Sequence, residues 1–486
     1  MNFGFLDSTL GSGQFILLIL CLLIALGFEV VNGFHDTANA VATVIYTRSL
    51  KPGVAVVWSG ICNFLGVFVG GIAVALAIVH LLPIDLLVSN GASGGLAAVL
   101  ALLVAAVLWN LGTWFYGLPA SSSHTLIGAI LGVGLANSLL PGHTLGSGVN
   151  WGKAEDVGLS LLLSPLVGFS VAALLLWLSK RFLRQPYLYE PTTDGAAPPK
   201  WIRSILILTC TGVSFAHGSN DGQKGVGLIM LVLIAILPAH FALNLEYSPE
   251  QMARTARAAA GIQVTLRQHV QNAPNGTMIL PVQQRSPSAT IPAAGSISDR
   301  LETIRERLAN RTSLTALPDS LRWELRKSIL EVDNLLAGLE KSGALQLSPD
   351  QARAMKQNRD DLRAITDYAP LWVLIAVAAA LGLGTMIGWQ RIVVTVGEKI
   401  GMSHLSYAQG AAAELVAMST IGLSTLAGLP VSTTHVLASG IAGTMVANKT
   451  GLHSSTIRRI AMAWILTLPV SMLLAGGLFL LFRLFI

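Results

Sequence analysis

The chain has 486 residues, of which 53% are hydrophobic and only 12% are charged, and its mean hydropathy is +0.64. Soluble domains carry about 25% charged residues, so this composition excludes an ordinary soluble protein and predicts an all-α polytopic membrane protein. The net charge of +6 does not indicate nucleic-acid binding, because 16 of the 31 Lys and Arg lie in one polar segment that also holds 14 acidic residues.

Long apolar runs predict ten membrane spans, since about 20 residues cross a bilayer as a helix. The expected spans are residues 14–47, 53–79, 94–116, 117–138, 157–179, 202–243, 370–388, 407–427, 428–447 and 460–485, with the first and sixth broken. The first run lacks the basic segment and cleavage site of a signal peptide, so we expect it to be retained. The three cysteines, Cys21, Cys62 and Cys210, lie in apolar runs and are expected to be packing residues.

Two polar motifs interrupt the apolar runs. The first is NGFHDTANA at residues 32–40, and the second is HGSNDGQKG at residues 217–225. Ionisable groups at bilayer depth are costly and usually mark the path of an ion or a substrate. A break in a spanning helix is tolerated where it lines a cavity or is buried in protein. We therefore expect both motifs to break their helices and to line a site.

Two Pro-Ser motifs match each other, GLPASSSH at residues 117–124 and GLPVSTTH at residues 428–435. Pro119 and Pro430 are expected in the first turn of a helix. Hydroxyl groups and free backbone N–H groups at a helix start form a site for an oxyanion, and the helix dipole adds on the order of 1 kcal/mol. The candidate substrate-binding residues here are Ser121, Ser122, Ser123, Ser432, Thr433 and Thr434. The alternative is that these residues are only helix caps.

The motifs repeat in the same order, which predicts two halves of five spans each. Asp36 and Asp221 are 185 residues apart, and the Pro-Ser motifs are 311 apart; the difference of 126 is about the length of the polar segment. An odd number of spans per half reverses the second half, which is the inverted-repeat layout of secondary transporters, with binding at the midplane.

The predicted segments are a first transmembrane repeat (1–181), a cytoplasmic linker (182–200), the start of the second repeat (201–243), a soluble insert (244–368) and the remainder of the second repeat (369–486). Within the insert, residues 299–343 and 348–366 have helical spacing and residues 271–298 are expected to form a loop. Two predictions are kept for this segment: a small helical appendage, or a partly disordered loop.

Basic residues orient the chain. With the N-terminus outside, 12 Lys and Arg fall in the predicted inner loops and 2 in the outer loops and termini. This bias obeys the positive-inside rule. Both termini and the insert are then expected on the outer side of the membrane.

The polar motifs supply oxygen-bearing side chains, namely Asp36, Asn39, Asn220 and Asp221. Such oxygens suit hard cations, and the carboxylates would repel an anion unless a proton or a cation lies between them. This conflict predicts that an anion and a cation bind together. Lys224 stands where the first motif has Asn39, and its ammonium group takes the charge position of a coupling cation, which favours coupling to protons over coupling to sodium. The alternative is that the acids only brace helix breaks.

Other ionisable residues receive weaker predictions. Glu29 is a candidate proton carrier or, equally, a brace for the first break, and Glu414 is a further intramembrane acid. His124 and His435 are expected to be structural. His35 and His217 do not occupy equivalent positions in the two polar motifs, so they are assigned no catalytic role. The sequence has no nucleotide-binding or zinc motif, so we expect neither an enzyme nor a resident metal or cofactor.

These four motifs, GFHDTANA, HGSNDGQKG, GLPASSSH and GLPVSTTH, resemble the inorganic phosphate transporter (PiT) family over nearly the whole chain, most closely its bacterial low-affinity members. The resemblance implies symport of inorganic phosphate with protons, carried as a neutral complex with Mg or another divalent metal, across the bacterial inner membrane. It implies that Asp36, Asn39, Asp221 and the Ser and Thr residues of both Pro-Ser motifs line the site. The family more commonly has Asn where this chain has Lys224, which argues against a sodium site.

Several alternatives stay open. These are a permease for sulfate or another oxyanion, a sodium-coupled phosphate symporter, an anion channel and an intramembrane enzyme that uses Ser and His. The sequence leaves undecided whether two copies form a homodimer and what the insert does.

Overall fold

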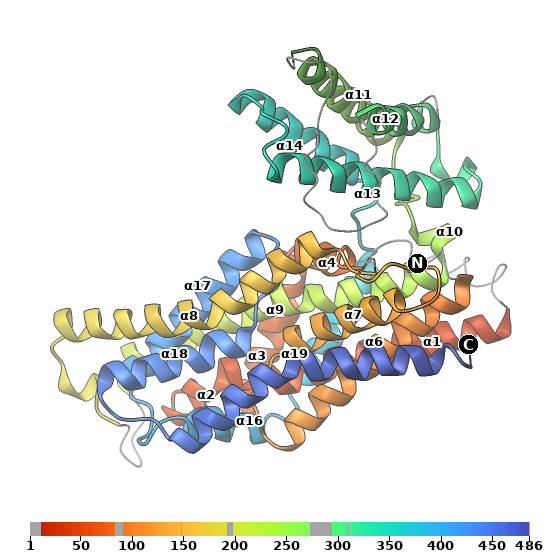
Figure 1. Cartoon of the computed structure of the whole chain (residues 1–486). Helices are drawn as coiled ribbons and strands as arrows, with labels where there is room; N and C mark the ends of the chain where they lie inside the picture. Colours follow the sequence, from red (N-terminus) through yellow and green to blue (C-terminus); the bar gives the residue numbers. More distant parts are fainter. Residues whose placement is uncertain are drawn as a thin grey trace. The chain divides into compact units, whose positions relative to one another are not determined.

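A computed structural model describes residues 11–82, 91–146, 148–191, 198–272, 294–309 and 311–485 (Figure 1). The chain divides into two compact units. One unit combines Gly11–Val232 with Ala369–Ile486, and the other contains Leu233–Tyr368. The boundaries of the five segments predicted from the sequence stay predictions.

The first unit is built from helices alone in its described part. Its first half contains α1 (Ser12–Asp36), α2 (Ala38–Tyr46), α3 (Pro52–Val69), α4 (Ala73–Val79), α6 (Gly91–Phe115), α7 (Ser122–Ser138) and α8 (Trp151–Phe182). Its second half contains most of α9 (Lys200–Ile236), then α15 (Leu371–Thr385), α16 (Gln390–Val394) with a π-turn at Thr395–Lys399, α17 (Tyr407–Leu426), α18 (Thr433–Asn448) and α19 (Ser454–Phe482).

Apolar side chains point outward from this unit, as in a protein whose solvent is lipid. Leu162, Leu166, Leu208 and Leu473 are more than 60% exposed, while Asp36 and many other polar residues are buried. Five described helical segments are long and apolar enough to span a bilayer: Ser12–Tyr46, Pro52–Val69, Gly94–Phe115, Trp151–Phe182 and Ser454–Phe482. A bent pair, Leu371–Thr385 with Gln390–Lys399 at 56°, makes a sixth if the two helices form one span. The predicted class, an all-α polytopic membrane protein, is confirmed.

The other four predicted spans correspond to α7, α9, α17 and α18. The helices α7 and α18 have 17 and 16 residues, and α9 and α17 carry buried polar side chains such as Lys224 and Glu414. That these four cross the membrane stays a prediction.

The predicted break in the sixth span is wrong, because α9 runs without interruption through residues 217–225. Its glycines serve close packing instead. A Cβ at Gly218 would collide with the backbone of Asn63 on α3. The polar side chains of this segment find partners on neighbouring elements, so the backbone ladder of α9 stays closed.

The predicted break in the first motif is confined to one residue. Thr37 separates α1 from α2, and its hydroxyl donates to the Gly33 carbonyl (2.6 Å) and to the Thr385 carbonyl (2.9 Å). A break that the sequence did not predict interrupts the second span between α3 and α4, where Gly71 has a φ of 73°, a conformation that favours glycine.

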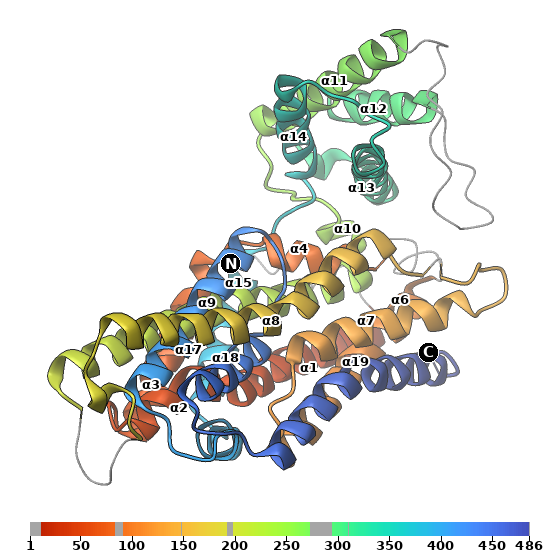
Figure 2. The ribbon, with the colours of Figure 1, turned by 60° about the vertical axis from the view of Figure 1, so that its left-hand side comes forward.

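The two halves interlock through reciprocal helix pairs. The helices α7 and α19 pack along each other, as do α8 and α18 (Figure 2). The helix α1 packs on α15. Close approach is possible because small residues lie at the crossings: a Cβ at Gly132 would collide with Met472, and one at Gly443 would collide with Phe169. The fourth helix of each predicted half therefore packs on the last helix of the other.

The second unit has its own apolar core. It contains α10 (Pro238–Phe241), α11 (Pro249–Asn272), α12 (Ala294–Leu308), α13 (Asp319–Lys341) and α14 (Pro349–Arg363). Leu and Ile side chains from α11 to α14 form one buried cluster. The buried Arg326 donates to the carbonyls of Ala242 and Thr366, which lie where the chain enters and leaves this helical cluster. Burial raises the pKa of Asp367, the residue after Thr366, to about 6.

The helical reading of the insert is confirmed in part. The stretch 299–343 forms α12 and α13 with an interruption before Asp319, and 348–366 contains α14. The sequence missed α11. Residues 273–293 of the predicted loop and 192–197 of the predicted linker lie outside the described residues.

Candidate functional site

The four motifs predicted from the sequence meet at two buried carboxylates. Asp36, at the end of α1, accepts a hydrogen bond from Thr434 Oγ1 at 2.7 Å and another from Thr433 Oγ1 at 3.2 Å. The Ser122 hydroxyl lies 3.3 Å from Asp36 Oδ2 and 3.4 Å from Asp221 Oδ2, so it is shared between the two acids. The polar motifs and the Pro-Ser motifs therefore form one cluster, and all of these residues are buried.

The Pro-Ser motifs begin their helices one turn later than the sequence suggested. The helices start at Ser122 and Thr433, so Pro119 and Pro430 lie before the caps and not in the first helical turn. Ser121 and Ser432 are the N-caps, and each accepts a hydrogen bond from a backbone N–H three residues on, at 3.2 and 3.1 Å. Their side chains occupy the helix ends, and the hydroxyls that reach the acids belong to the residues after them.

Each polar motif faces the Pro-Ser motif of the other half. Beside Asp36, the Asn39 carboxamide donates to Thr434 Oγ1 at 3.1 Å and lies 3.4 Å from Thr433 Oγ1. At the equivalent position beside Asp221, Lys224 Nζ lies 2.5 Å from Ser123 Oγ. The site thus has two similar sides, one with a neutral donor and one with an ammonium group.

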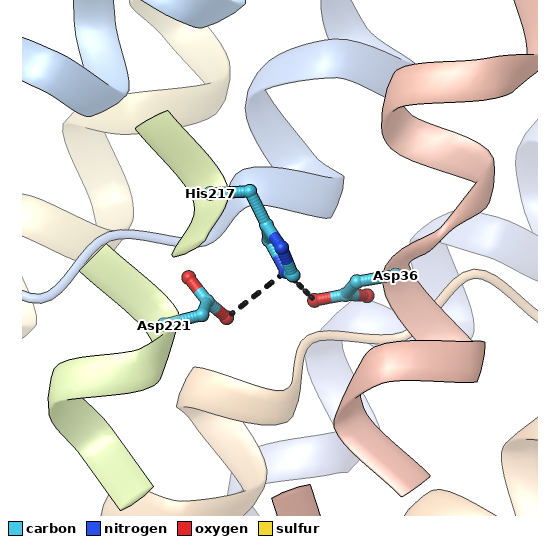
Figure 3. Close-up of side chains that lie close together, drawn as sticks. All are labelled: Asp36, His217 and Asp221. Atoms are coloured by element: carbon cyan, nitrogen blue, oxygen red, sulfur yellow. Dashed lines mark ion pairs between the residues drawn. The ribbon is translucent and has the colours of Figure 1, made fainter. Parts of the chain in front are cut away.

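His217 lies between the two acids (Figure 3). Its Nε2 is 3.6 Å from Asp36 Oδ2 and 3.7 Å from Asp221 Oδ2. One donor atom from each of the three residues lies within 4.8 Å of the others. His217 was not predicted as a site residue, because His35 does not occupy the equivalent position in the first motif. The spacing of four residues between His217 and Asp221 places both side chains on one helix face and is the signal that could have identified His217.

A chain of hydrogen bonds fixes the orientation of the His217 ring. The Thr385 hydroxyl donates to the Leu381 carbonyl at 2.8 Å, so its oxygen accepts from Asn63 Nδ2 at 2.9 Å. The Asn63 carbonyl oxygen then faces His217 Nδ1 at 2.9 Å, and Nδ1 must carry a proton to donate to it. The Nε2 atom is left facing the carboxyl groups of Asp36 and Asp221, and a proton or a cation shared among the three groups would stabilise this arrangement.

Two predicted site residues lie outside this cluster. Asn220 braces the loop before α18: it donates to Thr425 Oγ1 at 3.1 Å and to the Leu429 carbonyl at 3.2 Å. Glu29 lies against Gly225 and is 3.5 Å from Asn32 Nδ2. Asn220 thus holds the segment before α18, where its Oδ1 also accepts from the Val431 N–H at 3.4 Å, and Glu29 lies next to the site. The binding role of Asn220 and the coupling role of Glu29 stay predictions.

The remaining buried polar residues connect helices around the site. Glu414 accepts hydrogen bonds from Thr43 on α2 and Thr209 on α9. His124 and His435, predicted to be structural, face each other with ring centroids 4.5 Å apart. His35 contacts Asp36 Oδ1 through Nδ1 at 3.2 Å.

The geometry joins hydroxyl groups at two helix starts with a cluster of acids and cations inside a membrane protein. A family model described as the phosphate transporter family matches residues 32–475. The chain belongs to this family.

Curated relatives agree with this placement. The chain is 43% identical to the low-affinity inorganic phosphate transporter PitA of Escherichia coli K12, with 96% of each chain covered, and 43% identical to PitB of the same strain at the same coverage. It is 27% identical to a probable low-affinity inorganic phosphate transporter of Bacillus subtilis, with 94% of each covered. These relatives are named as transporters, so the family predicted from the motifs is confirmed, and the protein is not an enzyme.

A solved structure titled "The sodium-dependent phosphate transporter" shares the fold. It has a TM-score of 0.52 and 19% sequence identity, and the match covers 97% of this chain and 100% of that one.

Proposed function

We propose that this protein is a secondary active symporter that takes up inorganic phosphate with low affinity across the bacterial inner membrane, coupled to protons. The observation that carries the proposal is the convergence of Asp36 and Asp221 on the hydroxyl-rich starts of α7 and α18. The substrate is proposed from the relatives, which are named as low-affinity inorganic phosphate transporters.

The helix starts supply the phosphate contacts. The hydroxyls of Ser122, Ser123, Thr433 and Thr434 point into the cluster. The first N–H groups of each helix have no partner within the helix, and two helix dipoles favour an anion, each by about 1 kcal/mol. Hydroxyl and backbone donors suit the oxygens of phosphate.

The acids supply the contacts to the accompanying cation. A phosphate beside two buried carboxylates is repelled unless positive charge lies between them. Asp36, His217 and Asp221 offer two carboxylate oxygens and an imidazole nitrogen within 4.8 Å of one another, a set that suits a divalent metal. Phosphate would therefore enter as a neutral complex with Mg or another divalent metal, which is part of the substrate.

The fixed charge at Lys224 supports proton coupling. Its ammonium group lies 2.8 Å from Asp221 Oδ1 and leaves no place there for sodium. A proton carried by the nearby Glu29 would then accompany phosphate, while Asp36 and Asp221 stay ionised as ligands of the metal. Both termini and the insert would face the periplasm, as the basic residues of the loops indicate.

The test is uptake of radiolabelled phosphate into proteoliposomes. We expect saturable uptake that is driven by an inward proton gradient without sodium, is stimulated by magnesium, and is competed by arsenate more strongly than by sulfate. Truncating one partner of a buried charge pair weakens binding by about 3 kcal/mol, so Asp36→Asn and Asp221→Asn should each lower uptake by about a hundredfold.

Each alternative has its own signature. Labelled sulfate carried faster than phosphate would identify a sulfate permease, and uptake that requires sodium and ignores the proton gradient would refute proton coupling. A current that does not saturate with substrate would identify a channel.

A further inference from the structure

Lys224 is completely buried at the predicted centre of the membrane unit, and oxygen atoms surround its ammonium group. Its Nζ lies 2.5 Å from Ser123 Oγ, 2.8 Å from Asp221 Oδ1 and 3.1 Å from the Val431 carbonyl oxygen. These three oxygens come from three separate parts of the chain: the start of α7, α9 and the segment before α18. The fold therefore builds a pocket for one positive charge at this point.

The ligands of this pocket are those that a small metal cation prefers. Carboxylate, hydroxyl and carbonyl oxygens are hard donors, and carbonyls of non-helical segments coordinate sodium in membrane carriers. Val431 precedes the helix cap Ser432, so its carbonyl lies outside any helical ladder. It accepts from Lys224 and also from the Ser123 hydroxyl, at 2.7 Å.

The equivalent position in the first motif is neutral. Asn39 replaces lysine there, and its carboxamide donates to the hydroxyls of α18 without supplying charge to Asp36. The two sides of the site are otherwise alike, since each pairs an Asp with hydroxyls of a Pro-Ser motif. The difference between Asn39 and Lys224 is thus a difference of one fixed cation.

We infer that the Lys224 ammonium group is a tethered cation that fills a sodium-type site formed by Ser123, Asp221 and Val431, and that this residue determines which ion accompanies the substrate. The inference rests on the proposed transport function. It predicts that shortening Lys224 to the residue of the first motif, Lys224→Asn, opens the site and makes transport depend on sodium.

The experiment compares wild type, Lys224→Asn and Lys224→Met by phosphate uptake into proteoliposomes, with sodium or choline as the external cation at equal pH on both sides. Lys224→Met is the matched control, because its side chain fills the same space without charge and offers no hard oxygen. We expect wild-type uptake to be equal in both salts. Both variants should lose on the order of tenfold or more in choline, because a buried carboxylate loses its partner. Sodium should restore uptake by Lys224→Asn alone.

A second measurement keeps the inference testable if Lys224→Asn does not transport. Purified protein is heated in detergent with sodium chloride or choline chloride, since an ion that binds the folded state stabilises it. A higher unfolding temperature in sodium for Lys224→Asn, absent in wild type and in Lys224→Met, supports the site. Equal unfolding temperatures together with no sodium-stimulated uptake overturn it, as does a Lys224→Asn variant that transports like wild type in choline.

Failure of this inference and failure of the proposed function give different results. If wild-type protein transports no phosphate, the proposed function fails, and the sodium-dependent stabilisation of Lys224→Asn still decides whether Lys224 fills a cation site. If wild type transports phosphate and the variant responds to sodium in neither measurement, only the inference about Lys224 fails.

Discussion

His217 owes its orientation to residues that do not touch the two acids. Asn63 on α3 accepts from its Nδ1, and Thr385 on α15 holds the Asn63 carboxamide in the orientation that makes this possible. Groups behind a metal ligand fix its tautomer and typically change metal affinity by about 10- to 100-fold when removed. If His217 holds the metal of the proposed substrate complex, Asn63 would act on the site through His217.

The prediction is that Asn63→Leu raises the magnesium concentration needed for half-maximal phosphate uptake by about tenfold. Leucine removes the oxygen that accepts a hydrogen bond from Nδ1 of His217. The tautomer and orientation of the ring are then no longer fixed, so Nε2 is less available as a ligand beside Asp36 and Asp221. Uptake is measured in proteoliposomes over a magnesium series. Asn63→Asp, which restores an acceptor oxygen, is the control and should lie closer to wild type. Equal magnesium requirements for Asn63→Leu and wild type would remove Asn63 from the site.

Much of the site at this scale could be predicted from residue types alone. Asp36, Asp221 and the hydroxyls after the caps were predicted and do meet, because charged groups in an apolar chain must find one another. His217 and Asn63 could not be assigned in the same way. Their role depends on which helix of the first half lies against α9, and a motif of nine residues does not contain that information.

At the scale of helices, α3 and α9 approach so closely that glycine is required at their crossing. A Cβ at Gly66 would collide with the carbonyl of Phe215, two residues before the polar motif. Since α9 is continuous there, it cannot bend away locally to make room. The position of His217 and Asp221 therefore depends on this contact.

The prediction is that Gly66→Ala destabilises the protein by about 1–3 kcal/mol, the usual cost of overpacking a close contact. The measurement is the unfolding midpoint in detergent. Gly27→Ala on α1 is the matched control, because Gly27 also lies inside a helix and has no atom within 4 Å of an added Cβ; it should unfold close to wild type. If both variants unfold at the same temperature, the α3–α9 contact is not limiting.

Helices were predicted correctly where apolar runs were long. Helices and helix breaks were predicted poorly in segments that contain glycine or alanine at the packed positions. The sequence predicted a break in α9 because Gly218, Gly222 and Gly225 accompany polar residues, yet these glycines serve packing against neighbouring helices. It missed the break at Gly71, whose surroundings are apolar. It also missed α11, whose buried face includes Ala259 as well as Met252 and Ile262.

For the membrane unit as a whole, packing of helices from one half against helices of the other explains how both sides of the site are positioned. The pairs α7 with α19 and α8 with α18 place the start of each Pro-Ser helix against the opposite half. Each of these starts also meets the polar motif of the opposite half, since Asp36 contacts α18 and Asp221 contacts Ser122 at the start of α7. This reciprocal arrangement supports the proposal that the halves are related by inversion across the membrane, which requires the ends of the chain and the insert to lie on defined sides.

The last prediction tests those sides by labelling single cysteines from outside intact spheroplasts. Ser342→Cys, at the end of α13, and Gln185→Cys, in the linker after α8, are both exposed positions. The three native cysteines are buried, so they give little background. Only one predicted span, which corresponds to α9, lies between these two positions, so they should be on opposite sides of the membrane. With the N-terminus outside, Ser342→Cys should react with a membrane-impermeant maleimide at once. Gln185→Cys should react only after the membrane is opened. Labelling of both positions from the same side would mean that α9, which lies between them and carries Asp221 and Lys224, enters the membrane without crossing it, and the inverted arrangement of the two halves would then be untenable.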